Sequence, residues 1–272
     1  MTKTPDRPLL WQKSKPGLQW LSFPASRLIY AVLSVVLFWI ILHVVVGKTV
    51  IPSPWQTVVN LVVLLPRIGR HLAVSLYRIL ASLLISTLSG GIIGLWIGLN
   101  KKADQLITPV VYLLYPLPKI AFLPILLILF GLGDSPKIIL IVIIVIFQII
   151  IAARDGVREI PPPLFHSVLS LGLGRRALYR HLILPAVTPR ILTAVRISIG
   201  VSISVLFFAE SFATTYGIGY FIMNSWLMVN YVNMFSGILA LGLLGLLLFS
   251  VVDLIEQRIC RWMKAGSLNT PL

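Results

Sequence analysis

Four ionisable residues interrupt long hydrophobic stretches of this sequence: Arg78, Lys119, Arg196 and Glu210. A charge inside an apolar segment is costly, so such residues usually mark a polar pathway or pair with one another. Three cations against one carboxylate favour a pathway for a small anionic or zwitterionic solute. The alternative is structural: the two arginines would extend to the ends of their segments, and Glu210 would pair with a cation, for example Arg196.

Motifs for other kinds of chemistry are incomplete. Residues 47–49 (GKT) end like a phosphate-binding loop, but Leu42 replaces the first glycine of G-x-x-x-x-G-K-[ST]. Residues 172–177 (GLGRRA) match G-x-G-x-x-A, yet no strand is predicted before them, as a dinucleotide site requires. The histidines are too scattered for a zinc site. We therefore expect no catalytic residue, metal or cofactor in this chain.

The composition is that of a membrane protein. Of 272 residues, 58% are hydrophobic and only 11% are charged, whereas soluble domains carry about 25% charged residues. The net charge of +15 comes from lysines and arginines at the edges of apolar runs, where cytoplasmic ends meet anionic lipid. The sequence has no basic patch interleaved with aromatic residues, the pattern that would indicate nucleic-acid binding. The single cysteine, Cys260, excludes an internal disulfide.

The hydrophobic pattern predicts an all-α polytopic membrane protein with about six spans, each needing roughly 20 residues. The spans cover about residues 28–46, 72–99, 106–130, 138–153, 191–210 and 235–255. Four prolines predict that the third span is broken or kinked. A proline-punctuated external loop is predicted at residues 47–71. Residues 211–234 form a loop, with or without a short re-entrant helix.

The distribution of basic residues predicts the orientation of these spans. With both termini on one side, sixteen lysines and arginines lie on that side and four on the other. The positive-inside rule makes the richer side cytoplasmic, in a multi-pass plasma-membrane protein. The resulting segments are a cytoplasmic tail (1–26), the first span with an external loop (27–69), a transmembrane core (70–257) and a second cytoplasmic tail (258–272).

The connection between the fourth and fifth spans, residues 166–185 (HSVLSLGLGRRALYRHLILP), is basic and partly amphipathic. Gly172 allows a tight, left-handed turn between two short helices, and Pro185 suits the start of the next helix. Leucines could enter a groove on a partner protein, inside a rim of arginines. These residues are Leu169, Leu171 and Leu173, with Arg175, Arg176 and Arg180. The alternative is an amphipathic helix lying on anionic lipid.

This connection resembles the cytoplasmic coupling loop of ABC-importer permeases, whose pattern reads E-A-A-x3-G-x9-I-x-L-P. Gly172 falls on the glycine of the pattern. Leu182, Leu184 and Pro185 fall on its final positions, and His166, Ser167 and Val168 replace the acidic residue and the alanines. Residues 75–98, 115–138 and 209–222 are also similar to the permeases that import sulfonates, taurine, nitrate, bicarbonate or thiamine precursors.

The resemblance implies a type I ABC importer fold with a coupling-helix loop. It also implies a second permease copy, a cytoplasmic ABC ATPase dimer that holds ATP and Mg²⁺, and an extracellular or periplasmic solute-binding protein. The lipid bilayer surrounds the assembly, and the chain itself holds no cofactor. The competing interpretation is an ion-coupled secondary transporter or channel without an ATPase. Inverted repeats would favour that class, and the sequence shows none.

Small residues recur every four positions in the second predicted span. They are Ser82, Ser86, Gly90, Gly94 and Gly98. This spacing places them on one helix face, where small side chains let another helix approach closely. We therefore expect the stripe to serve helix packing within the chain.

Overall fold

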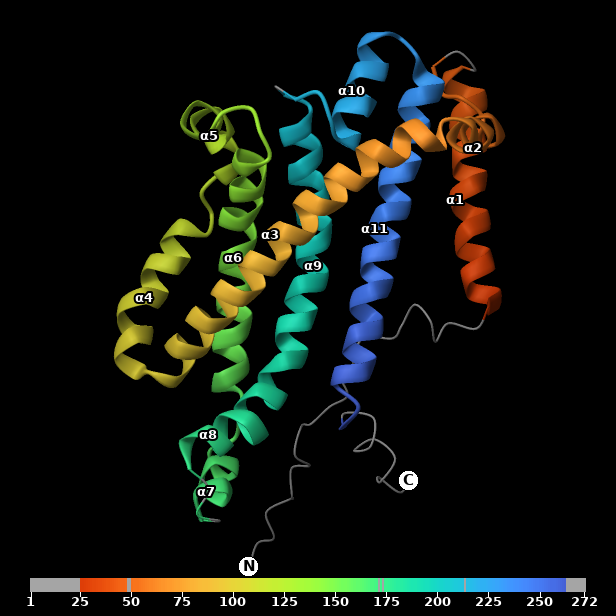
Figure 1. Ribbon diagram of the computed structural model, residues 1–272. Coiled ribbons are helices and arrows are strands. Elements are labelled where there is room, and N and C mark those ends of the chain that lie inside the picture. The colour runs from red at the N-terminus through yellow and green to blue at the C-terminus, as the bar shows by residue number, and fades with distance from the viewer. Residues whose placement is uncertain (1–24, 48–49, 171, 173, 213, 263–272) are drawn as a thin grey trace, which may run out of the picture.

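The computed structural model describes residues 25–47, 50–170, 172, 174–212 and 214–262 (Figure 1). Every regular element in these ranges is helical, which confirms the predicted all-α fold. In chain order the elements are α1 (Ala25–Val46), α2 (Pro54–Val63), α3 (Leu65–Leu99), α4 (Lys101–Leu114), the 3₁₀-helix η1 (Lys119–Phe122), α5 (Leu123–Phe130), α6 (Ser135–Arg158), α7 (Pro162–Ser170), α8 (Arg175–Leu178), the π-helix η2 (Tyr179–Ile183), α9 (Leu184–Glu210), α10 (Ile218–Leu227) and α11 (Tyr231–Ile259).

The described helices supply five membrane spans, or the predicted six if one bent helix pair counts as a span. Five are long and apolar enough to cross a membrane: α1, α3, α6, the continuous helix Arg175–Glu210, and α11. α4 and the segment Lys119–Phe130 meet at an angle of 80° and are either a sixth, broken span or a re-entrant loop. The break contains Pro116 and Pro118, which cannot donate the backbone hydrogen bonds that a continuous helix needs.

One stretch predicted as loop is mostly helical. Within residues 47–71, α2 occupies Pro54–Val63 and α3 begins at Leu65 rather than near residue 72. Pro54 and Pro66 each lie in the first helical turn, where the missing N–H costs nothing because it has no partner there. Ser53 and Gln56 add a capping box at the start of α2. These prolines therefore mark helix starts rather than interruptions.

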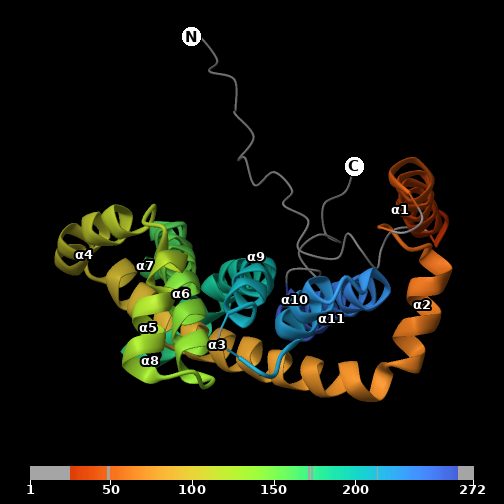
Figure 2. The ribbon, with the colours of Figure 1, turned by 90° about the horizontal axis from the view of Figure 1, so that it is seen from above.

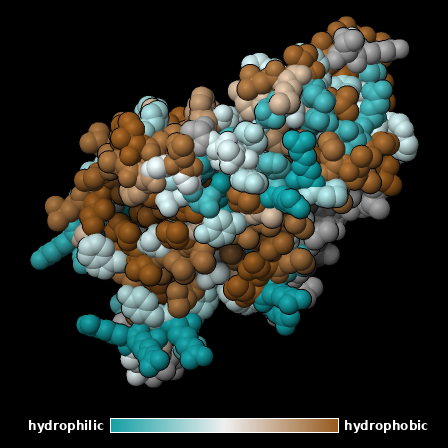
Figure 3. All heavy atoms as spheres, turned by 45° about the horizontal axis from the view of Figure 1, so that its top comes forward, coloured by the Kyte–Doolittle hydropathy of each residue, from teal (hydrophilic) through white to brown (hydrophobic). Residues whose placement is uncertain are grey.

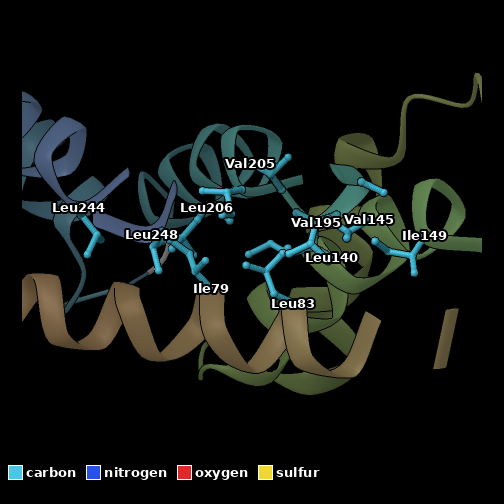
Figure 4. Close-up of a cluster of buried hydrophobic side chains, with 14 of the residues drawn as sticks. Ile79, Leu83, Leu140, Val145, Ile149, Val195, Val205, Leu206, Leu244 and Leu248 are labelled. Atoms are coloured by element: carbon cyan, nitrogen blue, oxygen red, sulfur yellow. The ribbon is translucent and has the colours of Figure 1, made fainter. Parts of the chain in front are cut away.

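Helix α3 crosses the other long helices on one side of the molecule, as Figure 2 shows from above. Side chains from α3, α6, α9 and α11 meet along this crossing and form the main core (Figure 4). Ile79 and Leu83 of α3 contribute to it, together with Leu140 of α6, Leu206 of α9 and Leu248 of α11, all less than 8% exposed. The crossing fixes the relative positions of the four helices that carry most of the buried charges.

The two ends of the molecule differ in what they carry. In Figure 1 the start of α1, the end of α11, and both α7 and α8 lie at the lower end, whereas α2, α5 and α10 lie at the upper end. Figure 3 shows hydrophilic side chains gathered at the lower edge, below a largely hydrophobic belt. The predicted coupling segment therefore lies at the same end of the molecule as the start of α1 and the end of α11.

Candidate functional site

A buried arginine connects three helices at the end of the molecule that carries α10. Arg78 of α3 donates from Nη1 to Glu210 Oε1 at 2.7 Å, and from Nε and Nη2 to Asp134 Oδ1 at 2.8 and 2.5 Å. The side chains of Arg78 and Glu210 are 4% and 0% exposed, whereas that of Asp134 is 48% exposed. We call Arg78, Asp134 and Glu210 the outer clasp. It joins α3 to the start of α6 and the end of α9.

Glu210 also holds the beginning of α10. Its carboxylate accepts hydrogen bonds from Ser75 Oγ at 2.8 Å and from the Gly219 N–H at 2.9 Å. Gly217 precedes α10 with φ of +128°, and a Cβ at that position would overlap the Glu210 carboxylate. Glycine therefore meets two requirements there, a left-handed backbone and a close approach to the carboxylate.

Arg196 belongs to a second cluster. It pairs with Asp253 and Glu256, both on α11 and both buried. Glu210 therefore pairs with a cation, as the structural alternative predicts, but its partner is Arg78 and not Arg196. The expectation that Arg78 and Arg196 reach the ends of their segments is also wrong, since both are engaged in ion pairs between helices.

Two lysines are also buried. Lys119 donates from Nζ to the Tyr115 carbonyl at 2.7 Å, and its Nζ lies 4.8 Å from the centre of the Phe147 ring. Lys137 is fully buried and donates to the carbonyls of residues 132–133 at 3.0 and 2.8 Å. Of the four predicted pathway residues, only Arg78 and Glu210 are thus brought together.

Several ionic partners were not singled out by the sequence: Asp104, Asp134, Asp253 and Glu256. Asp104 accepts from Arg154 Nε at 2.6 Å and from Arg158 Nη2 at 2.8 Å, and so ties α4 to the end of α6. Every carboxylate among the described residues forms an ion pair with arginine. The sequence signal that could have identified them is the small number of acidic residues. With eight in the whole chain, each one is a candidate partner for a buried cation.

The predicted coupling segment forms two short helices around a turn. α7 ends at Ser170, Gly172 has the expected left-handed backbone with φ of +70°, and α8 begins at Arg175. From there the chain continues through η2 into α9 with no intervening loop. Pro185 lies in the first turn of α9, as the sequence predicts.

Most side chains of this segment are accessible. His166, Ser167, Arg175, Arg176 and Leu184 are exposed, and Val168, Leu182 and Pro185 are half-buried. Leu169 lies in α7, whereas Leu171 and Leu173 lie outside the described residues. Within the described ranges, Arg175 and Arg176 form no ion pair. A partner protein would therefore find these guanidinium groups free.

The stripe of small residues on α3 faces α6. A Cβ added at Gly94 would lie 2.5 Å from the Ile150 carbonyl oxygen, and one at Gly98 would lie 2.8 Å from Val157 Cβ. Gly90 has a similar approach to Ile146. Ser82 and Ser86 continue the same face and are fully buried. The two helix backbones thus approach so closely that side chains larger than hydrogen would have to displace them.

Comparison with known proteins identifies the family. The profile of the binding-protein-dependent transport system inner membrane component matches residues 90–264. The chain belongs to this family. The matched region contains the whole predicted coupling segment, together with α6, α9 and α11, and it shows that the protein is an ABC importer permease.

Relatives of this permease carry related names. The taurine transport system permease protein TauC of Escherichia coli is 31% identical over 71% of this chain and 70% of its own length. A putative aliphatic sulfonates transport permease protein of Bacillus subtilis is 28% identical over 92% of this chain and 91% of its own. The nitrate import permease protein NrtB of Leptolyngbya laminosa is 32% identical, with coverage of 70% and 68%.

A solved structure supports the same fold for the permease. A chain of the MetNI methionine ABC transporter, in an inward-facing conformation, superposes with a TM-score of 0.56 at 19% identity. The match covers 70% of this chain and 96% of that one. The type I ABC importer fold expected from the sequence is therefore confirmed, and the protein is a multi-pass membrane protein.

Proposed function

We infer that this permease works as a homodimer above two ATPase subunits, and that an external binding protein delivers its solute. ABC importers of this family need ATPase and binding-protein partners. The permease itself would carry out no chemical step, and ATP with Mg²⁺ would be held by the ATPase. The observation that carries the proposal is the family match over residues 90–264, which spans both the outer clasp residue Glu210 and the coupling segment.

The solute proposed for this permease is a small anion or zwitterion. The relatives are named for taurine, aliphatic sulfonates and nitrate. Two buried lysines, Lys119 and Lys137, form no ion pair within the described ranges, and their positive charge also favours an anionic group over a cation. A sulfonate group attached to a short carbon chain satisfies both observations.

The orientation proposed places α7, α8 and both termini in the cytoplasm. Support comes from the sixteen basic residues predicted on that side, and from the position of α7 and α8 beyond the lower ends of the spans (Figure 1). The coupling residues His166–Val168, Leu169, Leu171, Gly172, Arg175 and Arg176 would then face the ATPase. Leu182, Leu184 and Pro185 would connect this surface to α9.

Reconstitution tests this function against an ion-coupled transporter. The permease would be purified together with a candidate ATPase and a candidate binding protein, and uptake of labelled taurine into proteoliposomes would be measured. An ABC importer requires ATP and the binding protein, and its uptake survives a protonophore. Uptake that needs no ATPase and stops when the ion gradient is collapsed would replace the proposal with a secondary transporter.

A further inference from the structure

Helix α2 carries an apolar stripe on the face that is turned away from the helix bundle. We call it the α2 stripe. Its members are 43–75% exposed and follow the spacing i, i+3, i+4, i+7, i+8: Trp55, Val58, Val59, Val62 and Val63. At about 100° per residue they cover an arc of roughly 140° of the helix surface. The whole helix contains no acidic or basic residue.

The opposite face of α2 carries its buried polar groups and is turned toward α11. Asn60 Nδ2 donates to Asn233 Oδ1 at 2.9 Å and to Ser236 Oγ at 3.0 Å. Ser236 Oγ donates in turn to the carbonyl of Thr57 at 3.1 Å, and Thr57 is fully buried. A helix on a water-exposed surface has the reverse arrangement, with its polar side chains outward. The sequence of α2 is therefore suited to apolar surroundings on its outer side.

Helix α2 lies across the ends of the membrane spans and not parallel to them. It is seen nearly end-on in Figure 1, where α6 and α11 run lengthwise, and along its length in Figure 2. Its ten residues extend over about 15 Å, which is half of the roughly 30 Å of hydrocarbon in a bilayer. This position corresponds to the membrane surface opposite α7 and α8.

The neighbours of α2 in the chain favour phospholipid as the environment of the stripe. α1 is apolar, and none of the described residues 29–46 is buried. Arg67 and Arg70 follow α2 in the first turns of α3 and are exposed, where guanidinium groups can pair with lipid phosphates. Trp55 is 75% exposed, and tryptophan is enriched at the level where hydrocarbon meets the headgroups.

A second copy of the chain is a poorer match to the size of the stripe. A standard protein–protein interface uses about 20–30 residues from each partner, whereas the α2 stripe has five. Shallow insertion into a bilayer needs only one face of one helix, at a depth of about 5–10 Å. The dimensions of α2 therefore favour a lipid surface over a protein surface.

We propose that α2 is an interfacial anchor, with the α2 stripe inserted into the leaflet opposite the coupling segment and the helix axis parallel to the membrane plane. Asn60 ties this anchor to α11, and only Leu64 separates it from α3. The ends of two spans are thereby held at the lipid surface. The inference goes beyond the proposed function and depends on neither the solute nor the ATPase.

The depth of spin labels in the bilayer tests the proposal. Trp55→Cys and Val62→Cys, each in a Cys260→Ala background, would carry a nitroxide in the permease–ATPase complex in nanodiscs. Collisions with oxygen, which concentrates in lipid, would be compared with collisions with a water-soluble nickel chelate. We expect oxygen to dominate at both positions and the two depths to agree within about 3 Å, the rise of two residues.

This pair of positions distinguishes a parallel helix from a spanning one. Seven residues make about two turns, so both labels point in the same direction from the helix axis. A spanning helix would separate their depths by about 10 Å, since each residue rises about 1.5 Å. Ser170→Cys, exposed on α7, is the aqueous control and should collide mainly with nickel.

Two charge substitutions give a matched comparison, with Val59→Cys as the labelled reporter. Val62→Glu places a carboxylate in the stripe and should shift the reporter from oxygen-dominated to nickel-dominated collisions, because a charge in the membrane is costly. Gln56→Glu adds the same charge at the edge of the stripe. It keeps the capping box with Ser53 and should leave the reporter near its wild-type depth.

Each alternative environment has its own result, and each overturns the proposal. Nickel-dominated collisions at both Trp55→Cys and Val62→Cys would place α2 in water. Poor access of both reagents would place the stripe against a second copy of the chain. A depth difference near 10 Å would make α2 part of a span. Equal shifts of the reporter in Val62→Glu and Gln56→Glu would show that the stripe does not hold the helix in lipid.

Discussion

Arg78 and Glu210 are 132 residues apart in the chain, and their side chains meet at 2.7 Å in the interior. Both are at most 4% exposed, and Glu210 depends on Arg78 for charge compensation, whereas Arg78 also pairs with Asp134. Removing one partner of a buried pair leaves an uncompensated charge, which typically costs about 3–5 kcal/mol, whereas replacing both is often tolerated. The outer clasp can therefore be tested by comparing single and double substitutions.

We expect Arg78→Met to lower the thermal midpoint of the purified permease substantially, Glu210→Gln to lower it less because Arg78 keeps Asp134, and the double substitution to recover much of the loss caused by Arg78→Met. Asp134→Asn is the matched control, because this partner of Arg78 is half exposed and its loss should be mild. Uptake by the folded double variant reports separately on a pathway role. Wild-type stability of Arg78→Met would show that the pair is not structural.

Two glycines of α3 should respond oppositely to alanine. At Gly94 an added Cβ would lie 2.5 Å from the Ile150 carbonyl oxygen, whereas at Gly91 it would meet only Ile191 Cδ1 at 3.9 Å. Both changes gain helix propensity, about 1 kcal/mol, but overpacking commonly costs about 1–3 kcal/mol. Gly94→Ala should thus reduce thermal stability and Gly91→Ala should maintain or raise it. Equal thermal midpoints for Gly94→Ala and Gly91→Ala would contradict the proposed close contact at Gly94.

Gly172→Val should insert and fold, yet lose association with the ATPase. Its Cβ would meet no atom within 4 Å, so only the left-handed backbone, φ +70°, opposes the change. That conformation costs a non-glycine residue about 1–2 kcal/mol, enough to reshape an exposed turn but not the bundle. Gly174→Val, at φ of −67° and also in open space, is the control. Co-purification of the ATPase with both variants decides the matter.

The arginines of α8 should contribute to the same association through charge. Arg175→Glu combined with Arg176→Glu is expected to weaken ATPase binding, and added salt should weaken the wild-type complex as well, because exposed charges are screened. Tyr179→Phe, on the following exposed turn, preserves the charge and serves as the comparison. Salt-independent binding by the wild type would assign the association to apolar contacts alone.

Membrane orientation can be read from cysteine labelling in intact cells. Ser170→Cys should be protected from an impermeant maleimide, and Thr215→Cys, exposed before α10, should react. The native Cys260 gives little background, because burial raises the pKa of its thiol and keeps it protonated. Cys260→Ala removes this background entirely. Labelling of Ser170→Cys from outside would invert the proposed topology.

The spans were predictable because each depends on local composition. Long apolar runs, their basic ends and the prolines at residues 116 and 118 mark them without reference to the rest of the chain. Residues 47–71 were predicted as a loop for the same reason, because local composition alone was used. A proline indicates a helix break unless it is known to lie in the first turn of a helix. The left-handed turn at Gly172 also follows from local chemistry alone.

The ionic partners were not predictable to the same degree. Arg78 could be singled out as costly, but the choice among distant carboxylates depends on how α3 crosses α9, which no local pattern encodes. Asp253 lay within the predicted sixth span and met the criterion that identified Glu210.

The uninterrupted helix from Arg175 to Glu210 has a mechanical consequence. Its 36 residues extend over about 50 Å, with the exposed arginines of α8 at one end and the carboxylate that holds Arg78 and α10 at the other. No loop separates the arginines of α8 from Glu210, so a displacement of one end can pass to the other through continuous helix. Two irregular points lie along it: the π-helical turn at Tyr179–Ile183, a kind of turn that often occurs at functional sites, and Pro189 inside α9, which removes a backbone hydrogen bond. We expect the bending stiffness at these two points to limit how much of a displacement of α8 reaches the outer clasp.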